Sequence, residues 1–200
     1  MREGYNPQFL DEDNDAFHIA LPTPSMKLQE DVLLPVDSID GNPELKYIHY
    51  SLMMSKSTRQ ALFSAANVDN AKQKVVSGKK GRKWFVDPRV DRAFQIDNYA
   101  YKNSPWDRGH LTRRTAVTWG NSATALAASN DSCAYTNAAL QHAEFNEDEW
   151  RVPEKLVAEH DLAKNKKLNV ITGSLFTTCD RFLTRALGAP PVRIPSGFWK

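Results

Sequence analysis

The sequence has few cysteines and no long run of apolar residues. Cys133 and Cys179 are the only cysteines among the 200 residues, and neither belongs to the CxxC pairing of a zinc site. Two buried thiols are expected, with a single bridge as the alternative. No stretch of about 18 or more apolar residues is present, and this excludes a membrane-spanning helix. We therefore expect no interaction with a membrane.

No signal peptide is expected from the N-terminal residues, and neither sign of charge is in strong excess. The N-terminal residues 1–17 do not show the basic-then-apolar order of a secretory signal, so secreted and cytoplasmic locations both stay open. Lys and Arg total 26 against 24 Asp and Glu, and a net charge of +2 does not by itself attract a polyanion. A basic stretch at 79–92, KKGRKWFVDPRVDR, interleaves Trp84 and Phe85, a pattern that suits a phosphate backbone.

The length and composition favour one globular unit. Residues 1–44 are rich in proline and acidic residues and have no sustained period, so they are interpreted as an extended arm or linker before a domain at 45–200. Alternating apolar and polar residues predict a strand at 45–55. Residues 57–69 suit a strand and a short helix equally well, and short strands are predicted within 131–141 and 167–176.

A helix is predicted within residues 146–165, whose first turn is acidic. Asn146 suits its N-cap, but Pro153 then lies in the second turn and removes a backbone hydrogen bond. If the helix instead starts near Val152, Pro153 takes the favourable first helical position. We therefore expect a kink or a helix in two parts.

The segment SPWDRGHLTRR, residues 104–114, carries the clearest chemical signal. An imidazole at His110 beside the guanidinium of Arg108 has its cationic form disfavoured, and a general base has to be neutral. Arg108, Arg113 and Arg114 offer forked donors that match phosphate oxygens. A neutral base among such arginines indicates phosphodiester hydrolysis.

The residues that follow this segment resemble the DNA/RNA non-specific endonuclease family, the group of endonuclease G and the sugar-non-specific bacterial nucleases. In that family, DRGH is followed by a strand carrying Asn and Gln, then by an Asn, a Trp four residues on and a Glu four further. This sequence has the same series at the same spacing: Asn137, Gln141, Asn146, Trp150 and Glu154. The resemblance covers roughly Tyr47 to the C-terminus, including the basic stretch and the terminal RIPSGFWK.

The resemblance implies an α+β fold of the ββα-metal nuclease type, with a mainly antiparallel central sheet and flanking helices. It also implies a Mg²⁺-dependent endonuclease that cuts DNA and RNA, with Mn²⁺ as a substitute metal. His110 matches the general base, and Asn146 matches the single protein ligand of the metal. Such sparse ligation suits Mg²⁺, which keeps several of its waters.

Further site residues follow from the same resemblance. Arg108 and Arg82 match the arginines that grip phosphate, and Glu154 matches a residue that orients water at the metal. Asn137 matches a polar residue that supports the site, by orienting His110. Apart from the resemblance, Trp106 and Trp150 are expected to be packing anchors, His142 a structural histidine and Asp107 a residue that structures its turn.

The expected partners are DNA and RNA, with a homodimer or an inhibitor or immunity protein as further partners. A second interpretation is a catalytically impaired nucleic-acid-binding module of the same fold. It is prompted by Pro153, which stands immediately before Glu154 and departs from the family pattern.

Overall fold

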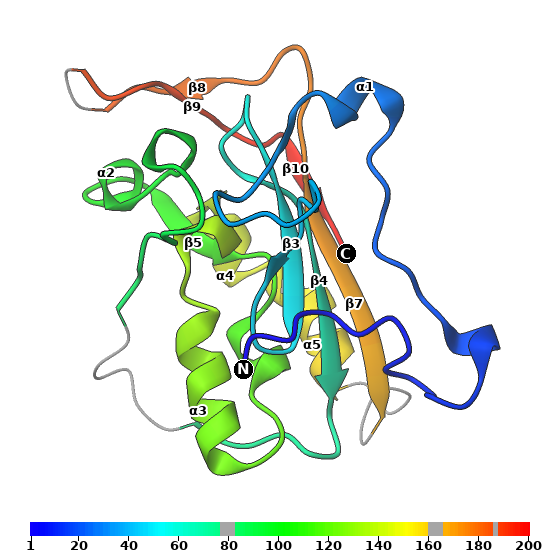
Figure 1. The fold of residues 1–200 in the computed structure, drawn as a ribbon. Coiled ribbons are helices and arrows are strands. Elements are labelled where there is room, and N and C mark those ends of the chain that lie inside the picture. Colours follow the sequence, from blue (N-terminus) through cyan, green and yellow to red (C-terminus); the bar gives the residue numbers. More distant parts are fainter. Residues whose placement is uncertain (77–82, 160–165, 186–187) are drawn as a thin grey trace.

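A computed structural model describes residues 1–76, 83–159, 166–185 and 188–200. Within this part of the chain, the centre of the fold is a six-stranded antiparallel sheet (Figure 1). Its main path runs, in spatial order, through β1 (Val32–Leu33), β3 (Tyr50–Ser55), β4 (Ala61–Asp69), β7 (Lys167–Leu175) and β10 (Gly197–Trp199), and β2 (Leu45–Lys46) also pairs with β3. Two antiparallel pairs lie outside this sheet, namely β5 (Trp106–His110) with β6 (Ala138–His142), and β8 (Phe182–Leu183) with β9 (Val192–Arg193).

The helices of the described residues are short. The α-helices are α1 (Met26–Gln29), α2 (Asn98–Tyr101), α3 (Ser122–Asp131), α4 (Ala143–Glu147) and α5 (Arg151–Glu159). The 3₁₀ helices are η1 (Asp15–Phe17), η2 (Arg92–Phe94), η3 (Arg114–Val117) and η4 (Tyr135–Asn137). None of the helices in the described residues has the length and the apolar character that crossing a membrane requires.

Both faces of the large sheet are covered by other parts of the chain. Alternate side chains of each strand point to opposite faces, so one strand contributes to both apolar clusters. On one face, Leu52 of β3 and Val68 of β4 share a buried apolar cluster with Leu111, which follows β5. On the other face, Phe63 of β4 packs in a cluster with Tyr5 from the N-terminal segment. In Figure 1, α2, α3 and β5 lie to the left of the sheet, and α1 with much of the N-terminal segment lies to its right.

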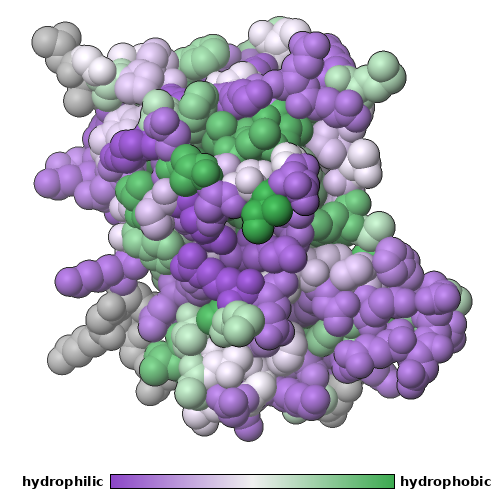
Figure 2. All heavy atoms as spheres, viewed as in Figure 1, coloured by the Kyte–Doolittle hydropathy of each residue, from purple (hydrophilic) through white to green (hydrophobic). Residues whose placement is uncertain are grey.

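The N-terminal segment 1–44 is largely extended and is laid over the sheet. Tyr5 is buried at 5% exposure, and the Gly4 amide donates to the Tyr47 carbonyl over 2.9 Å. The exposed acidic residues around η1 lie in the hydrophilic lobe at the lower right of Figure 2. Because β1 of this segment pairs with β3, the segment adds a strand to the sheet, and a domain boundary at residue 45 stays a prediction.

The predicted strands are present. Residues 45–55 form β2 and β3, separated at His49, whose φ of 70° lies in the left-handed region. The ambiguous segment 57–69 contains β4, and the strands predicted within 131–141 and 167–176 are β6 and β7. β4 is a strand because its residues pair on both sides, with β3 and with β7.

The prediction of a helix in two parts is confirmed, since α4 and α5 are separate. The prediction that Asn146 is the N-cap is wrong, because α4 begins at Ala143 directly after His142 and Asn146 lies inside it. Pro153 takes the third position of α5, in the first turn, where its missing N–H removes no intrahelical bond. The last residues of the predicted helix, 160–165, lie outside the described residues.

The two cysteines do not form a bridge. Cys133 is buried, but Cys179 is exposed. The prediction of two buried thiols is therefore wrong for Cys179, which lies in a surface turn where the Thr177 amide donates to Asp180.

A buried polar network ties the sheet to the segment that precedes β6. The Tyr47 hydroxyl donates to Oδ2 of Asp87 over 2.6 Å and lies 2.7 Å from Oγ1 of Thr136. Arg89 grips the same carboxylate, with Nη2–Oδ2 at 2.7 Å and Nε–Oδ1 at 3.0 Å. Burial by itself raises the pKa of Asp87, but the hydrogen bonds from Arg89 and Tyr47 outweigh it and hold the pKa below its usual value.

We predict that Asp87→Ala lowers the free energy of unfolding by about 3 to 5 kcal/mol, because a buried partner of Arg89 and Tyr47 is lost. Urea denaturation at pH 7 measures the change. Since the pKa of Asp87 is lowered in the folded protein, its contribution is present above about pH 4 and is lost as the pH falls through the folded-state pKa, so the difference from wild type narrows in acid.

The matched control is Arg92→Ala, which removes an ion pair to Asp97 whose arginine is 56% exposed. This change is expected to lower the free energy of unfolding by less than about 1 kcal/mol. Equal effects of the two substitutions would show that the Asp87 network does not stabilise the fold.

Candidate active site

The antiparallel β5–β6 pair carries the DRGH segment. Asp107 of β5 lies opposite Gln141 of β6, and His110 lies opposite Ala138. The chain leaves β6 and enters α4 without a loop, since β6 ends at His142 and α4 begins at Ala143. This direct connection fixes α4 against the strand pair, as Figure 1 shows beside the large sheet.

Arg108 and His110 contact the same aromatic ring, as their alternate positions in β5 allow. The rings of His110 and Trp84 have centroids 4.8 Å apart, and Cζ of Arg108 lies 5.9 Å from the Trp84 ring. Both side chains are half-buried. The base and one arginine predicted from the sequence are thus brought together.

Asn146 is brought to β5 by a hydrogen bond. Its Nδ2 donates to Oδ2 of Asp107 over 3.0 Å, which links α4 to the strand of the DRGH segment. Because the amide nitrogen makes this bond, the carbonyl Oδ1 of Asn146 is left for a different partner. The prediction that Asp107 structures a turn is wrong, because Asp107 lies within β5 and its carboxylate accepts a hydrogen bond from the amide of Asn146.

Gln141 of β6 is a buried residue to which the sequence pattern assigned no role. Its side chain is 1% exposed, and within the described residues neither amide atom has a hydrogen-bond partner. The side chain lies over Gly109, where a Cβ would overlap it. Native proteins rarely leave a buried amide unsatisfied, so Gln141 marks a place for water or a ligand. The glycine in DRGH was the available signal, because a strand glycine often marks a close approach by a neighbouring group.

The oxygen-bearing side chains here suit a hard cation such as Mg²⁺. Asp107, Gln141 and Asn146 belong to β5, β6 and α4, the three elements of the site, and each carries a carboxylate or amide oxygen. Among the described residues, no group of three or more His, Cys, Asp and Glu side chains could enclose a metal.

Asn137 is wholly buried and binds backbone groups just beyond β5. Its Oδ1 accepts from the Thr112 amide at 2.9 Å, and its Nδ2 donates to the carbonyls of Thr112 and Ser132, each at 3.0 Å. It thereby fixes the chain two residues after His110. A supporting role for Asn137 through this backbone contact stays a prediction.

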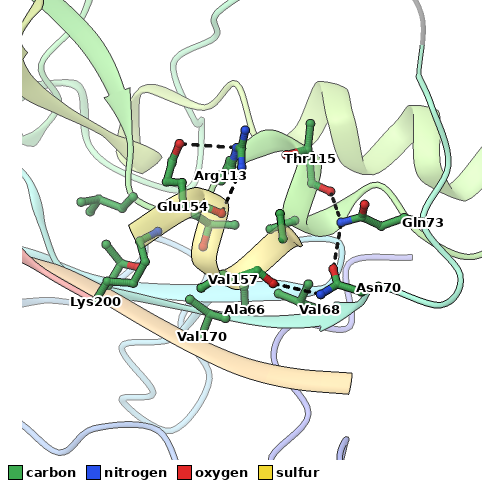
Figure 3. Close-up of a pocket in the computed structure, with 15 residues that line it drawn as sticks. Ala66, Val68, Asn70, Gln73, Arg113, Thr115, Glu154, Val157, Val170 and Lys200 are labelled. Atoms are coloured by element: carbon green, nitrogen blue, oxygen red, sulfur yellow. Dashed lines mark hydrogen bonds and ion pairs between the residues drawn. The ribbon is translucent and has the colours of Figure 1, made fainter. Parts of the chain in front are cut away.

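Glu154 lies in a separate small pocket (Figure 3). Its Oε2 is 3.4 Å from Nε of Arg113, and Nη1 of Arg113 donates to its carbonyl over 3.1 Å. Burial raises the pKa of Glu154, an effect that the charges of Lys200, Arg113 and Arg151 partly offset. Burial likewise lowers the pKa of Lys200 to about 8, against the opposing effect of Glu154. The hydrogen bonds and ion pairs described for Glu154 join it to Arg113, and its role at the metal stays a prediction.

Of the remaining predicted residues, the structure describes Trp106 and Trp150. Arg82 lies outside the described residues. Trp150 is buried at 5% exposure and packs on Phe198, as expected of a packing anchor. Trp106 is half-buried against His142, with their rings edge to face at 5.7 Å.

The antiparallel β5–β6 pair leads directly into a helix, as in the ββα-metal nuclease fold. The similarity to a solved structure of this fold shows that the protein has it too. A sequence model of the DNA/RNA non-specific endonuclease family matches residues 30–200. The chain belongs to this family, and the predicted family and fold class are confirmed.

Two similar proteins are informative. "Uncharacterized protein y4fB" of Sinorhizobium fredii is 29% identical over 210 residues, which cover 100% of this chain and 30% of that protein. The chain thus spans 30% of the length of this relative. The solved structure of the EndoG/EndoGI complex matches with a TM-score of 0.64 and 19% identity over 89% of this chain and 73% of the matched chain, which shows a shared fold.

We predict that Gly109→Ala destabilises the β5–β6 pair, because the added methyl group collides with the buried Gln141 side chain. The free energy of unfolding should fall by about 1 to 3 kcal/mol, the usual range for overpacking. Gly197→Ala is the control, since its added Cβ would meet Leu175 at an ordinary 3.6 Å. Thermal unfolding compares the two variants, and equal stability would rule out the close approach of Gln141.

Proposed function

We propose that the protein is a Mg²⁺-dependent endonuclease that hydrolyses phosphodiester bonds of DNA and RNA, with Mn²⁺ as a substitute metal. The observation that best supports it is the hydrogen bond from Asn146 to Asp107, which presents an amide oxygen at the junction of β5 and α4. Membership of the endonuclease family supports the same substrate class.

Asn146 would hold the cation through Oδ1, with Asp107 fixing the amide and Gln141 adjacent to Asp107 across the strand pair. When bound, a divalent cation neutralises charge that develops on the phosphate and on the leaving oxygen. Sequence-independent cleavage follows if the protein contacts the backbone of the nucleic acid and not its base edges.

In the proposed reaction, His110 takes a proton from a water molecule as that water attacks the phosphorus. The new bond joins the water oxygen to phosphorus, and the bond to the 3′ oxygen breaks. This leaves a 5′-phosphate and, after the 3′ oxygen gains a proton, a 3′-hydroxyl. Arg108 stabilises the charge on the phosphate oxygens, together with Arg82.

Two supporting roles complete the proposal. Asn137 steadies the chain after His110 through its bonds to the Thr112 backbone. Glu154 orients water near the site, and for this its carboxylate has to leave or share its ion pair with Arg113.

That ion pair also favours the second candidate, a catalytically impaired nucleic-acid-binding module. A Glu154 carboxylate held by Arg113 is not available to water at the site. As a partner we propose an inhibitor or immunity protein, because the structurally similar EndoG was solved in complex with EndoGI and its inhibition was described. A homodimer stays a prediction.

We predict that the wild-type protein nicks supercoiled plasmid with Mg²⁺ and stops when EDTA is added. His110→Ala should slow cleavage by about 10²- to 10⁴-fold, because the general base is lost. His18→Ala, which changes an exposed histidine of the N-terminal segment, is the control and should keep the wild-type rate. Undiminished Mg²⁺-dependent cleavage by His110→Ala would refute the mechanism, and plasmid binding without cleavage by the wild type would favour the binding module.

A further inference from the structure

Three aromatic rings from three separate segments surround the guanidinium of Arg108. Cζ of Arg108 lies 5.9 Å from the ring of Trp84, 5.5 Å from that of Tyr101 in α2 and 6.0 Å from that of Tyr135 in η4. All three distances are within the reach of a cation–π contact, about 6 Å. We call these three residues the aromatic wall.

The rings of the aromatic wall also hold one another. The centroids of Trp84 and Tyr135 are 5.6 Å apart, and those of Tyr101 and Tyr135 are 6.1 Å apart at an interplanar angle of 16°. Tyr101 and Tyr135 are 5% and 8% exposed and belong to the buried cluster that includes Leu140 of β6. Tyr101 and Tyr135 are therefore part of the core, and Trp84 packs against it. The ring contacts hold the wall together without the arginine.

The guanidinium of Arg108 makes a hydrogen bond in addition to its contacts with the three rings. Its Nη2 donates to Oδ1 of Asn98, the first residue of α2. A guanidinium that lies on aromatic rings and is bonded at one end has lost most of its rotamer freedom during folding, so little is left to lose when a ligand binds. The planar group keeps its charge and a half-exposed position.

Trp84 connects this arginine to the predicted base, because its ring also lies 4.8 Å from the ring of His110. The two side chains of the DRGH segment are thus aligned against one surface. Such alignment favours catalysis, since groups that stabilise a transition state act best when they are already in place.

We propose that Trp84, Tyr101 and Tyr135 are positioning residues that hold the Arg108 guanidinium ready for a phosphate of the nucleic acid substrate. This inference rests on the proposed function. Tyr101 and Tyr135 act through Arg108, so their contribution should disappear when Arg108 is absent. Trp84 also contacts His110, so only part of its contribution depends on Arg108.

Tyr101 allows a clean test, because its hydroxyl is buried without a hydrogen-bond partner in the described part of the chain. Tyr101→Phe keeps the ring and should leave kcat/KM within about twofold of wild type, whereas Tyr101→Leu should lower it about tenfold through loss of a partly desolvated cation–π contact. The assay is Mg²⁺-dependent cleavage of a fluorescent oligonucleotide. Equal activity of the Phe and Leu variants would overturn the proposal.

A double-mutant cycle separates positioning from general damage to the fold. In an Arg108→Ala background, Tyr101→Leu should cause no further loss, whereas the same tenfold loss in both backgrounds would show that Tyr101 is merely structural. If Tyr101→Leu does not fold, Tyr135→Leu takes its place with Tyr135→Phe as its control, because the Tyr135 ring also lies against the Arg108 guanidinium.

The same double-mutant cycle is repeated with the affinity for the oligonucleotide, measured in EDTA by fluorescence anisotropy. If the wild type binds the oligonucleotide but does not cleave it, the proposed function fails. The coupling of Tyr101 to Arg108 is then measured only by the affinities of the variants for the oligonucleotide. If the wild type cleaves and neither readout shows coupling, the proposed function stands and the aromatic wall has no positioning role.

Discussion

The bond between Asn146 and Asp107 is the contact on which the site depends, because it joins α4 to β5. The ladder pairs β5 with β6, and the Ala143 amide donates to the Pro105 carbonyl where α4 begins. The bond from Asn146 to Asp107 adds a side-chain contact that holds the rest of this five-residue helix against β5. With this bond in place, one amide oxygen has a defined position at the junction of the three elements. Gln141, which lies opposite Asp107 in the strand pair, has a buried side chain over Gly109.

The rest of the fold keeps this small unit in place. Leu111 follows β5 and packs into the cluster on one face of the large sheet, and the buried network of Tyr47 and Asp87 reaches the segment just before β6 through Thr136. Both strands are therefore tied to the sheet at the same end of the pair, the end at which His110 lies opposite Ala138. The N-terminal segment covers the opposite face and so stabilises the sheet without entering the site.

Much of the fold could be predicted from the sequence, because alternation identifies strands such as β3 and the spacing after DRGH identifies a family. The sequence of residues 57–69 suits a strand and a short helix equally well, because β4 contains several small residues. Only the pairing of β4 with β3 and β7 makes this segment a strand. Residue type alone does not predict the start of α4, because Asn146 is a good capping residue that here bonds to Asp107, a contact 39 positions away. The ion pair of Glu154 with Arg113 and the aromatic wall are long-range contacts of the same kind, which no local pattern encodes.

The central proposal is that Asn146 holds the metal with an amide oxygen oriented by Asp107. The most direct test is an anomalous difference map from crystals of the protein soaked in Mn²⁺, compared with crystals of Asn146→Ala treated identically. We predict one strong peak in direct contact with Oδ1 of Asn146 in the wild type, and loss of that peak in the variant. A peak bound elsewhere, or a peak that persists in Asn146→Ala, would contradict the proposal.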